Sequence, residues 1–291
     1  HRRQRQRMRP GRELAARHLG TAAWAGHEGE GARYLWPSMF SRVAEVYDAR
    51  HGLKREHLAA FAQQAFARAR HNPLAQTRAW RFEGRSFDAD DALNPVVEGC
   101  LRRQDCAQVT DGAVAVVLAT GSFLRQHTQR RKLSARVAGW GHRGAGLGLD
   151  EKLRRAEGEA WLFPHLRAAV TDAYRRAAVM DASAVDVFEV HDCFSITGLV
   201  LMEHLGITAP GEAWRALEDG RIARVNPGGG LMGIGHPVGA TGVRMVLDAA
   251  RQVTGAAGAT QVEGARTAAT LNLGGSATTA VAFVVRQEAI S

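Results

Sequence analysis

The sequence has few cysteines, and its apolar runs are short. Its 291 residues include 3 Cys and 8 Pro, against 32 Gly. Three cysteines cannot build a disulfide framework, so a reducing, cytoplasmic setting fits this chain better than secretion. The longest apolar runs, 113–119 and 280–285, fall well below the roughly 20 residues that a transmembrane helix needs. We therefore expect a cytoplasmic protein with no membrane span.

Basic charge is concentrated at the start of the chain. The first twelve residues carry six Arg and no acidic residue, and without them the net charge falls from +9 to +3. A remainder of +3 does not indicate a nucleic-acid-binding protein. We expect residues 1–14 to be a disordered basic start, because Met8 gives the first twelve residues a single apolar side chain. A role as an arm for an anionic surface stays open.

The rest of the chain alternates helical and strand patterns, which predicts an α/β layered domain. The 45% apolar and 23% charged residues are typical of a folded protein. An apolar run after Asp111-Gly112 predicts a buried strand or a helix-to-strand corner over 109–120. Residues 14–37 and 74–94 are expected to be irregular. The expected helices are 39–49, 55–70, 161–180, 194–205 and 239–254, and the expected strands are 133–140, 185–190, 268–273 and 278–285.

The first candidate motif is His191-Asp192-Cys193-Phe194, between the strand over 185–190 and the following helix. Ligands in α/β folds bind at the carboxyl ends of strands. A thiol beside a helix N-terminus and near imidazoles can have a lowered pKa. A buried cysteine next to a capping aspartate is the alternative interpretation.

The second candidate motif is the glycine-rich stretch 226–242, which has seven glycines in seventeen residues. This composition argues against a regular element and permits close approach of backbone to a substrate. His236, followed by Pro237, is a candidate base or hydrogen-bond donor to an oxyanion. A surface histidine on a flexible loop is the alternative, and the absence of a GKS/T sequence excludes a P-loop.

The third candidate motif is Asn272-Leu273-Gly274-Gly275-Ser276, at the tip of the predicted hairpin between the last two strands. Backbone N–H groups of Gly274 and Gly275 could line an oxyanion pocket. By itself, such a Gly-Gly pair is more often only a turn.

Taken together and in order, the three motifs resemble those of the thiolase superfamily. The stretch 236–242 is close to the family signature GHPxGATG, and Arg103-Gln104-Asp105-Cys106 leading into 110–113 is similar to the end of the family's N-terminal half. The resemblance covers about residues 18–287. The tetrad at 191–194 and the Asn before the terminal glycines select the sterol-carrier-protein-type and archaeal-type thiolases.

The resemblance implies a thiolase-like αβα sandwich and an acetyl-CoA acetyltransferase that performs Claisen condensation or thiolytic cleavage of 3-ketoacyl-CoA. His236 would stabilise an oxyanion and the nucleophile's thiolate, His191 would orient a water or the thioester oxygen, and Cys193 would shuttle a proton. The amides of Gly274 and Gly275 would face the acyl oxyanion. Coenzyme A thioesters would be the substrates, with no cofactor or metal. A homo-oligomer, either dimer or tetramer, and a small zinc-ribbon/OB-fold partner protein are also implied.

The family's nucleophilic cysteine has no counterpart among the three cysteines, since Cys100 and Cys106 do not lie in a strand–turn–helix setting. We therefore expect an N-terminally truncated thiolase that is inactive alone. The expected parts are a loop domain over 15–95, a tail of the N-terminal half over 96–124 and a C-terminal thiolase domain over 125–291. A non-catalytic subunit that binds CoA esters or a partner is the alternative. The resemblance suggests four CoA-binding residues in the loop domain, namely Met39, Arg42, Trp80 and Arg81.

Overall fold

The computed structural model describes residues 20–21, 23, 25–127 and 133–290. The helices are α2 (Leu35–His51), α3 (Arg55–Ala69), α4 (Gly121–His127), α5 (Leu149–Arg155), α6 (Pro164–Arg176), α7 (Ser195–Leu205), α8 (Ala213–Glu218), α9 (Gly230–Ile234) and α10 (Thr241–Val253). The strands are β1 (Val96–Glu98), β2 (Leu101–Arg102), β3 (Leu133–Gly144), β4 (Val187–Val190), β5 (Thr267–Gly274) and β6 (Thr279–Ala289). The basic start lies outside the described residues.

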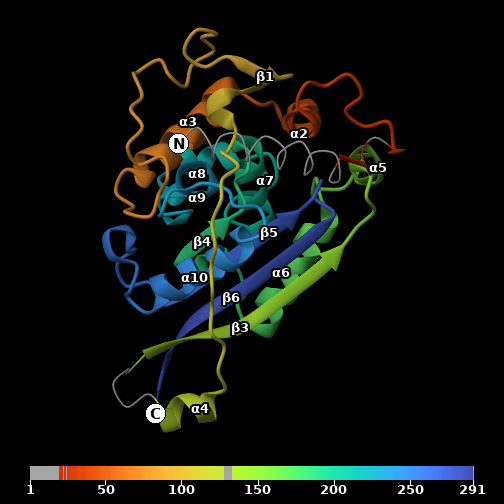
Figure 1. Cartoon of the computed structure of the whole chain (residues 1–291). Coiled ribbons are helices and arrows are strands. Elements are labelled where there is room, and N and C mark those ends of the chain that lie inside the picture. Colours follow the sequence, from red (N-terminus) through yellow and green to blue (C-terminus); the bar gives the residue numbers. More distant parts are fainter. Residues whose placement is uncertain (1–19, 22, 24, 128–132, 291) are drawn as a thin grey trace.

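A four-stranded mixed sheet in the order β3-β6-β5-β4 forms the centre of the fold. The β4 and β5 strands are parallel, with Val190 opposite Leu271, and the β5–β6 and β3–β6 pairs are antiparallel. Figure 1 shows α10 in front of this sheet and α6 behind it, so the sheet is the middle of three layers. The predicted α/β fold class and the predicted hairpin of the last two strands are confirmed.

Glycines on β3 allow α6 to pack directly on the sheet. A Cβ atom at Gly139 would lie 2.1 Å from the carbonyl oxygen of Ala173, and one at Gly141 would lie 1.8 Å from that of Ala169. These are backbone atoms within α6, which cannot move aside without distorting the helix. Any side chain at either glycine would therefore push helix and sheet apart.

The helices α2, α3, α7, α8 and α9 form a second packed group at one end of the sheet (Figure 1). All residues of α7 are buried, which explains its apolar sequence on every side. Gly198 of α7 lies against the ring of Phe61 from α3, and the left-handed Gly206 (φ 82°) ends α7 as expected.

Several expected elements differ from the structure. Residues 110–120 form no strand, and the chain runs as an extended trace to α4, with Val117 91% and Leu118 80% exposed (Figure 1). The expected strand was wrong because no neighbouring strand pairs with this run among the described residues. Helix α2 begins four residues earlier than expected, and α6 begins at Pro164, whose fixed φ suits the first turn.

The glycine-rich stretch also contains a regular element, contrary to expectation. The helix α9 forms there because the left-handed backbone of Gly229 (φ 104°) and Gly230 (φ 61°) starts it. Within the described residues, none of the helices is both long and apolar enough to cross a membrane.

Candidate active site

The carboxyl ends of β4 and β5 place the first motif. The His191 N–H donates to the Leu271 carbonyl at 3.1 Å, which continues the parallel pairing one residue past β4. Asn226 fixes the end of β4, because its side chain accepts from the Val190 N–H at 2.8 Å and donates to the Val190 carbonyl at 3.2 Å. His191 is therefore held on buried, hydrogen-bonded backbone at the edge of the sheet.

The structure brings His191 and His236 together. Their ring centroids are 5.1 Å apart and the rings are perpendicular. Both side chains are nearly buried, and His191 Nδ1 has no hydrogen-bond partner among the described residues. Two imidazoles from motifs 45 positions apart in sequence thus lie beside each other.

An extended segment lies between Cys193 and His236. The Ala107 N–H donates to the Cys193 carbonyl at 2.9 Å, and the Gln108 carbonyl accepts from the His236 N–H at 2.8 Å on the other side. Adjacent extended chains lie about 4.8 Å apart, so the two flanking backbones are about 10 Å apart. Convergence of Cys193 with the two histidines on one substrate stays a prediction.

Thr241 defines the hydrogen-bonding state of His236. The Thr241 hydroxyl donates to the Pro237 carbonyl at 3.1 Å and lies 2.8 Å from His236 Nδ1. Because the hydroxyl hydrogen is used by that carbonyl, we assign the Nδ1 proton to His236 as the donor to Thr241. Burial, followed by the charge of Arg244, lowers the pKa of His236 to about 4. A neutral His236 then carries its lone pair on Nε2 and can accept a proton there.

Asp192 holds the glycine-rich loop in place. Its Oδ1 accepts from the Leu231 N–H at 2.6 Å, in the first turn of α9. A Cβ atom added at Gly230 would lie only 2.1 Å from Asp192 Oδ2, so a side chain at this position would displace the carboxylate. Burial raises the pKa of Asp192 to about 7. The capping role that was considered for this aspartate is therefore present, although it caps α9 rather than α7.

The expected lowering of the Cys193 pKa was wrong. Burial raises the pKa of its thiol to about 12, and the sulfur lies 3.6 Å from the Thr197 hydroxyl. Burial likewise raises the pKa of the Cys106 thiol, and partial loss of solvation raises that of Cys100, although the residue as a whole is exposed. The helix N-terminus does not compensate for this loss of solvation. All three cysteines of the chain are thus protonated at neutral pH, a state that suits a proton donor and not a nucleophile.

The turn after β5 is held by the side chain of Lys152 from α5. Lys152 Nζ donates to the carbonyls of Gly146 at 2.6 Å and Leu147 at 3.0 Å, and to the hydroxyls of Ser276 and Thr278 at 3.3 and 3.1 Å. Gly275 has the left-handed backbone (φ 60°) that this turn needs. Gly274 and Gly275 lie past Leu271 at the carboxyl end of β5, on the same sheet edge as His191, and their oxyanion role stays a prediction.

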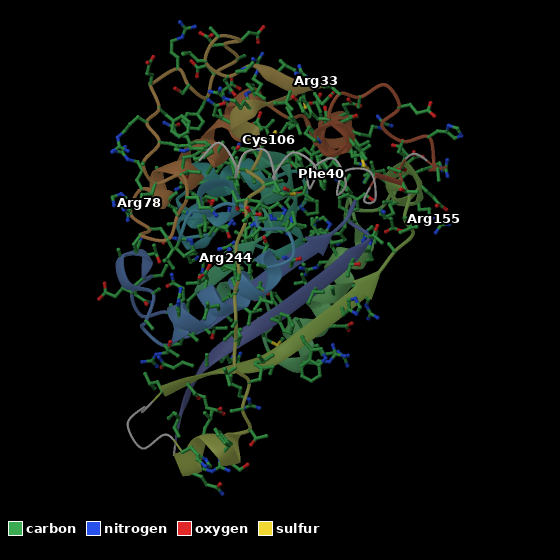
Figure 2. The ribbon with its side chains drawn as sticks, in the orientation of Figure 1. Arg33, Phe40, Arg78, Cys106, Arg155 and Arg244 are labelled. Atoms are coloured by element: carbon green, nitrogen blue, oxygen red, sulfur yellow. The ribbon has the colours of Figure 1, made fainter. Side chains whose placement is uncertain are left out.

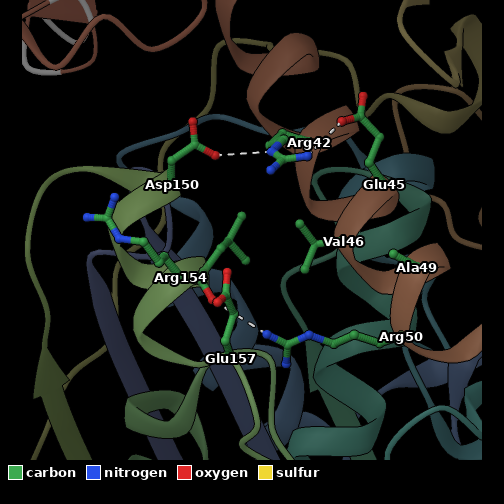
Figure 3. A pocket seen from close by; sticks show the side chains of 9 residues that line it. Arg42, Glu45, Val46, Ala49, Arg50, Asp150, Arg154 and Glu157 are labelled. Carbon is green, nitrogen blue, oxygen red and sulfur yellow. Dashed lines mark hydrogen bonds and ion pairs between the residues drawn. The ribbon is translucent and has the colours of Figure 1, made fainter.

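The four candidate CoA-binding residues do not lie together. Trp80 and Arg81 line a cavity of about 580 Å³ whose wall includes Gln108, the neighbour of His236. Arg42 instead lines a separate cleft of about 440 Å³ between α2 and α5, where it pairs with Asp150 and Glu45 (Figure 3). Met39 is buried in the core at 3% exposure. The prediction that Met39 contacts CoA was wrong, because the face of α2 that carries Met39 packs into the core.

Sequence reasoning missed four residues that build the site. They are Asp105, whose carboxylate pairs with Arg55 and accepts from the Ser195 hydroxyl at 2.9 Å, together with Asn226, Thr241 and the buried Arg244. Figure 2 labels Arg244 near the middle of the molecule and Cys106 above it. Left-handed φ at the non-glycine Asn226 (48°) marks it as a special position, but no sequence pattern showed this.

Comparison with known proteins relates the chain to the thiolases. The profile of the family described as "Thiolase C-terminal domain-like" matches residues 151–287. An acetyl-CoA acetyltransferase of Methanothermobacter thermautotrophicus is 32% identical over 270 residues, which cover 90% of this chain and 65% of the relative. Sterol carrier protein 2 of Bos taurus is 27% identical over 248 residues, covering 82% of this chain and 43% of the relative.

A solved structure titled "Ltp2-ChsH2(DUF35) aldolase" has a TM-score of 0.66 at 18% identity, covering 92% of this chain and 66% of that one. The sheet, its flanking helices and the two-histidine edge define a protein of the thiolase fold. The chain belongs to the thiolase superfamily and resembles its sterol-carrier-protein-2 type. It spans about two thirds or less of the length of the curated relatives that it matches.

Proposed function

We propose that this chain carries the enolate-forming part of carbon–carbon bond chemistry on CoA thioesters, as in an acyl-CoA acetyltransferase. The main observation behind this proposal is the perpendicular pair of buried, neutral imidazoles of His191 and His236 at the carboxyl edge of the sheet. Family membership and the acetyl-CoA acetyltransferase relatives support the substrate class.

The chemistry follows from the protonation of these groups. His236 Nε2 takes a proton from the carbon next to the thioester, and the electron pair moves onto the thioester oxygen as an enolate. The imidazolium formed at His236, or an N–H of His191, then donates to that oxygen, and such a donor contributes about 3 kcal/mol to transition-state stabilisation. In the return step the carbanion takes a proton from Cys193, as a protonated thiol, and the thiolate left there is reprotonated by the proton that His236 holds, so that both groups regain their starting state. No covalent acyl intermediate is assigned to the three protonated cysteines.

The aromatic cavity is the candidate entrance for coenzyme A. Phe66, Trp80, Phe82 and Phe87 form a ring cluster there, with Trp80 stacked on Phe66 at 5.9 Å, and Trp80 is 41% exposed. Arg81 and Arg103 also line the cavity, which offers cations for phosphates beside a surface for a nucleobase. The cavity wall reaches Gln108, whose carbonyl holds the His236 backbone, so the thioester end would point toward the histidine pair.

Deuterium exchange tests this proposal, because enolate formation needs no nucleophilic cysteine. The purified chain is incubated with acetyl-CoA in D₂O, and deuterium in the acetyl methyl group is measured by mass spectrometry. We expect exchange above the buffer rate and a loss of at least about tenfold in His236→Asn, since a positioned base contributes at least that much. His142→Asn, on the exposed surface of β3, is the matched control and should exchange like the wild type. Binding of acetyl-CoA without any exchange would overturn the enolate role.

The alternative function is a non-catalytic subunit that binds CoA esters or a second protein. The burial of Cys193 and the raised pKa of its thiol favour it, because an acid/base thiol must exchange protons with substrate. The aldolase neighbour is titled as a complex with a DUF35 protein, which supports a partner protein for this chain as well. Binding without exchange in the deuterium experiment is the result expected for this alternative. A homo-oligomer and the cytoplasmic location remain part of the proposal.

A further inference from the structure

The segment 106–109 lies between the first and the second candidate motif and pairs with both. An antiparallel bridge joins Cys106 to Phe194, and a parallel bridge joins Val109 to His236. Hydrogen bonds of 2.9 Å on the first side and of 2.8 and 3.2 Å on the second hold this pairing. The segment is therefore the middle strand of a three-stranded arrangement that fixes the two motifs relative to each other.

The register of these bridges places the side chains of Cys193 and His236 on one face of the arrangement. Ala107 lies opposite Cys193, one position along from the antiparallel bridge, and its N–H donates to the Cys193 carbonyl at 2.9 Å. Directly opposite residues point to the same face, and so do residues two positions apart in an extended strand. Ala107 and Val109 are two positions apart, so they form a floor between the thiol and the imidazole.

The opposite face of the segment packs into the core. Phe194, which shares that face with Cys106, stacks on the buried Phe40 of α2 with ring centroids 4.8 Å apart. On the floor side, Val109 is 56% exposed and Ala107 is half-buried. In the part of the chain that the structure describes, the floor side is thus the one that a ligand can reach.

We propose that Ala107 is a specificity-determining residue that limits the size of the acyl group between Cys193 and His236. This rests on the proposed function, in which His236 removes a proton from the carbon next to the thioester and Cys193 returns one. That carbon must lie between the two side chains, and hence over the floor. Ala107 has the smaller of the two floor side chains, a single methyl group, so it leaves room for a substituent on that carbon.

Paired measurements with acetyl-CoA and butanoyl-CoA test the proposal. Deuterium exchange at the carbon next to the thioester is measured in D₂O, and binding of each ester is measured by calorimetry. In Ala107→Val we expect the butanoyl-to-acetyl ratio to fall at least about tenfold in both measurements, because filling a subsite by a methylene-sized group discriminates by that much. Val109→Ala enlarges the same floor and should raise the ratio at least about twofold.

Ala115→Val is the matched control, since Ala115 is exposed on the extended continuation of the same segment and should leave the ratio unchanged. The ratio is the readout because a loss of folded protein lowers the signals of both esters equally. A folded Ala107→Val protein with an unchanged ratio would overturn the proposal. If Ala107→Val does not fold, an unchanged ratio in Val109→Ala overturns it instead.

The two measurements separate this proposal from the proposed function. A ratio that shifts in binding as expected, while the wild type exchanges neither ester, would reject the enolate chemistry and keep the size limit at Ala107. Exchange by the wild type with the same ratio in every variant would reject the role of Ala107 alone. Binding of neither ester would reject both.

Discussion

Replacing Gly230 by alanine should destabilise the protein through the contact that holds the glycine-rich loop. Gly230 has a left-handed backbone (φ 61°), and a Cβ atom there would lie 2.1 Å from Asp192 Oδ2 and 2.5 Å from Asn226 Nδ2. A left-handed alanine costs about 1 kcal/mol. Moving Asp192 aside weakens its 2.6 Å bond from the Leu231 N–H, worth about 2 kcal/mol. Together these give a loss of about 3 kcal/mol.

Thermal unfolding followed by circular dichroism measures this loss. About 3 kcal/mol corresponds to a fall in Tm of about 8 °C for a chain of this size. Gly239→Ala is the matched control, because a Cβ atom at Gly239 meets nothing within 4 Å and its φ is not left-handed. It should stay within about 0.5 kcal/mol of the wild type. A Gly230→Ala protein that unfolds within about 2 °C of the wild type would refute the packing argument.

Three further predictions concern buried polar groups. Because the folded-state pKa of Asp192 is raised from 3.8 to about 7, its stabilising effect is complete below pH 3.8 and is lost as the pH rises through about 7. In urea unfolding, the stability of Asp192→Asn relative to the wild type should therefore increase by about 1 kcal/mol per pH unit in that window. A stability difference that stays constant with pH would contradict this. Lys152→Met should lower the urea midpoint by the equivalent of about 2 kcal/mol, because it removes four hydrogen bonds that hold the turn after β5, and a midpoint equal to the wild type would count against that clamp. Iodoacetamide at pH 8 should label the exposed Cys100 in the native protein and Cys193 only after denaturation, as read by mass spectrometry; fast native labelling of Cys193 would disagree with its burial.

Elements whose stabilising contacts are local in sequence were predictable. The stripe at 58–69 predicted α3 to within one residue, because its apolar spacing directs one face of a helix to the core. The final hairpin followed from two apolar runs around a Gly-Gly pair, and the structure pairs them antiparallel. The strand predicted over 109–120 was wrong, because an apolar run becomes a strand only if another strand pairs with it.

In the candidate site, too, some features were predictable from the sequence and others depended on the fold. The motifs containing His191 and His236 were visible as residue types at strand and helix junctions, and the structure sets their rings 5.1 Å apart. The pKa of Cys193 was not predictable, because it depends on how much protein covers the sulfur, and burial outweighed the helix N-terminus. Arg42 also looked equivalent to Trp80 in sequence, yet the two residues line different cavities.

By itself the sequence determined the α/β class, most of the helices and strands, and the candidate motifs at their junctions, because apolar periodicity and turn-forming residues act over a few neighbouring positions. Only the tertiary structure decided the state of those residues. Asn226 fixes the end of β4, Thr241 sets the proton on His236, and burial followed by the charge of Arg244 lowers the pKa of His236. These contacts join positions far apart in the chain, and burial and charge at one point depend on everything folded around it.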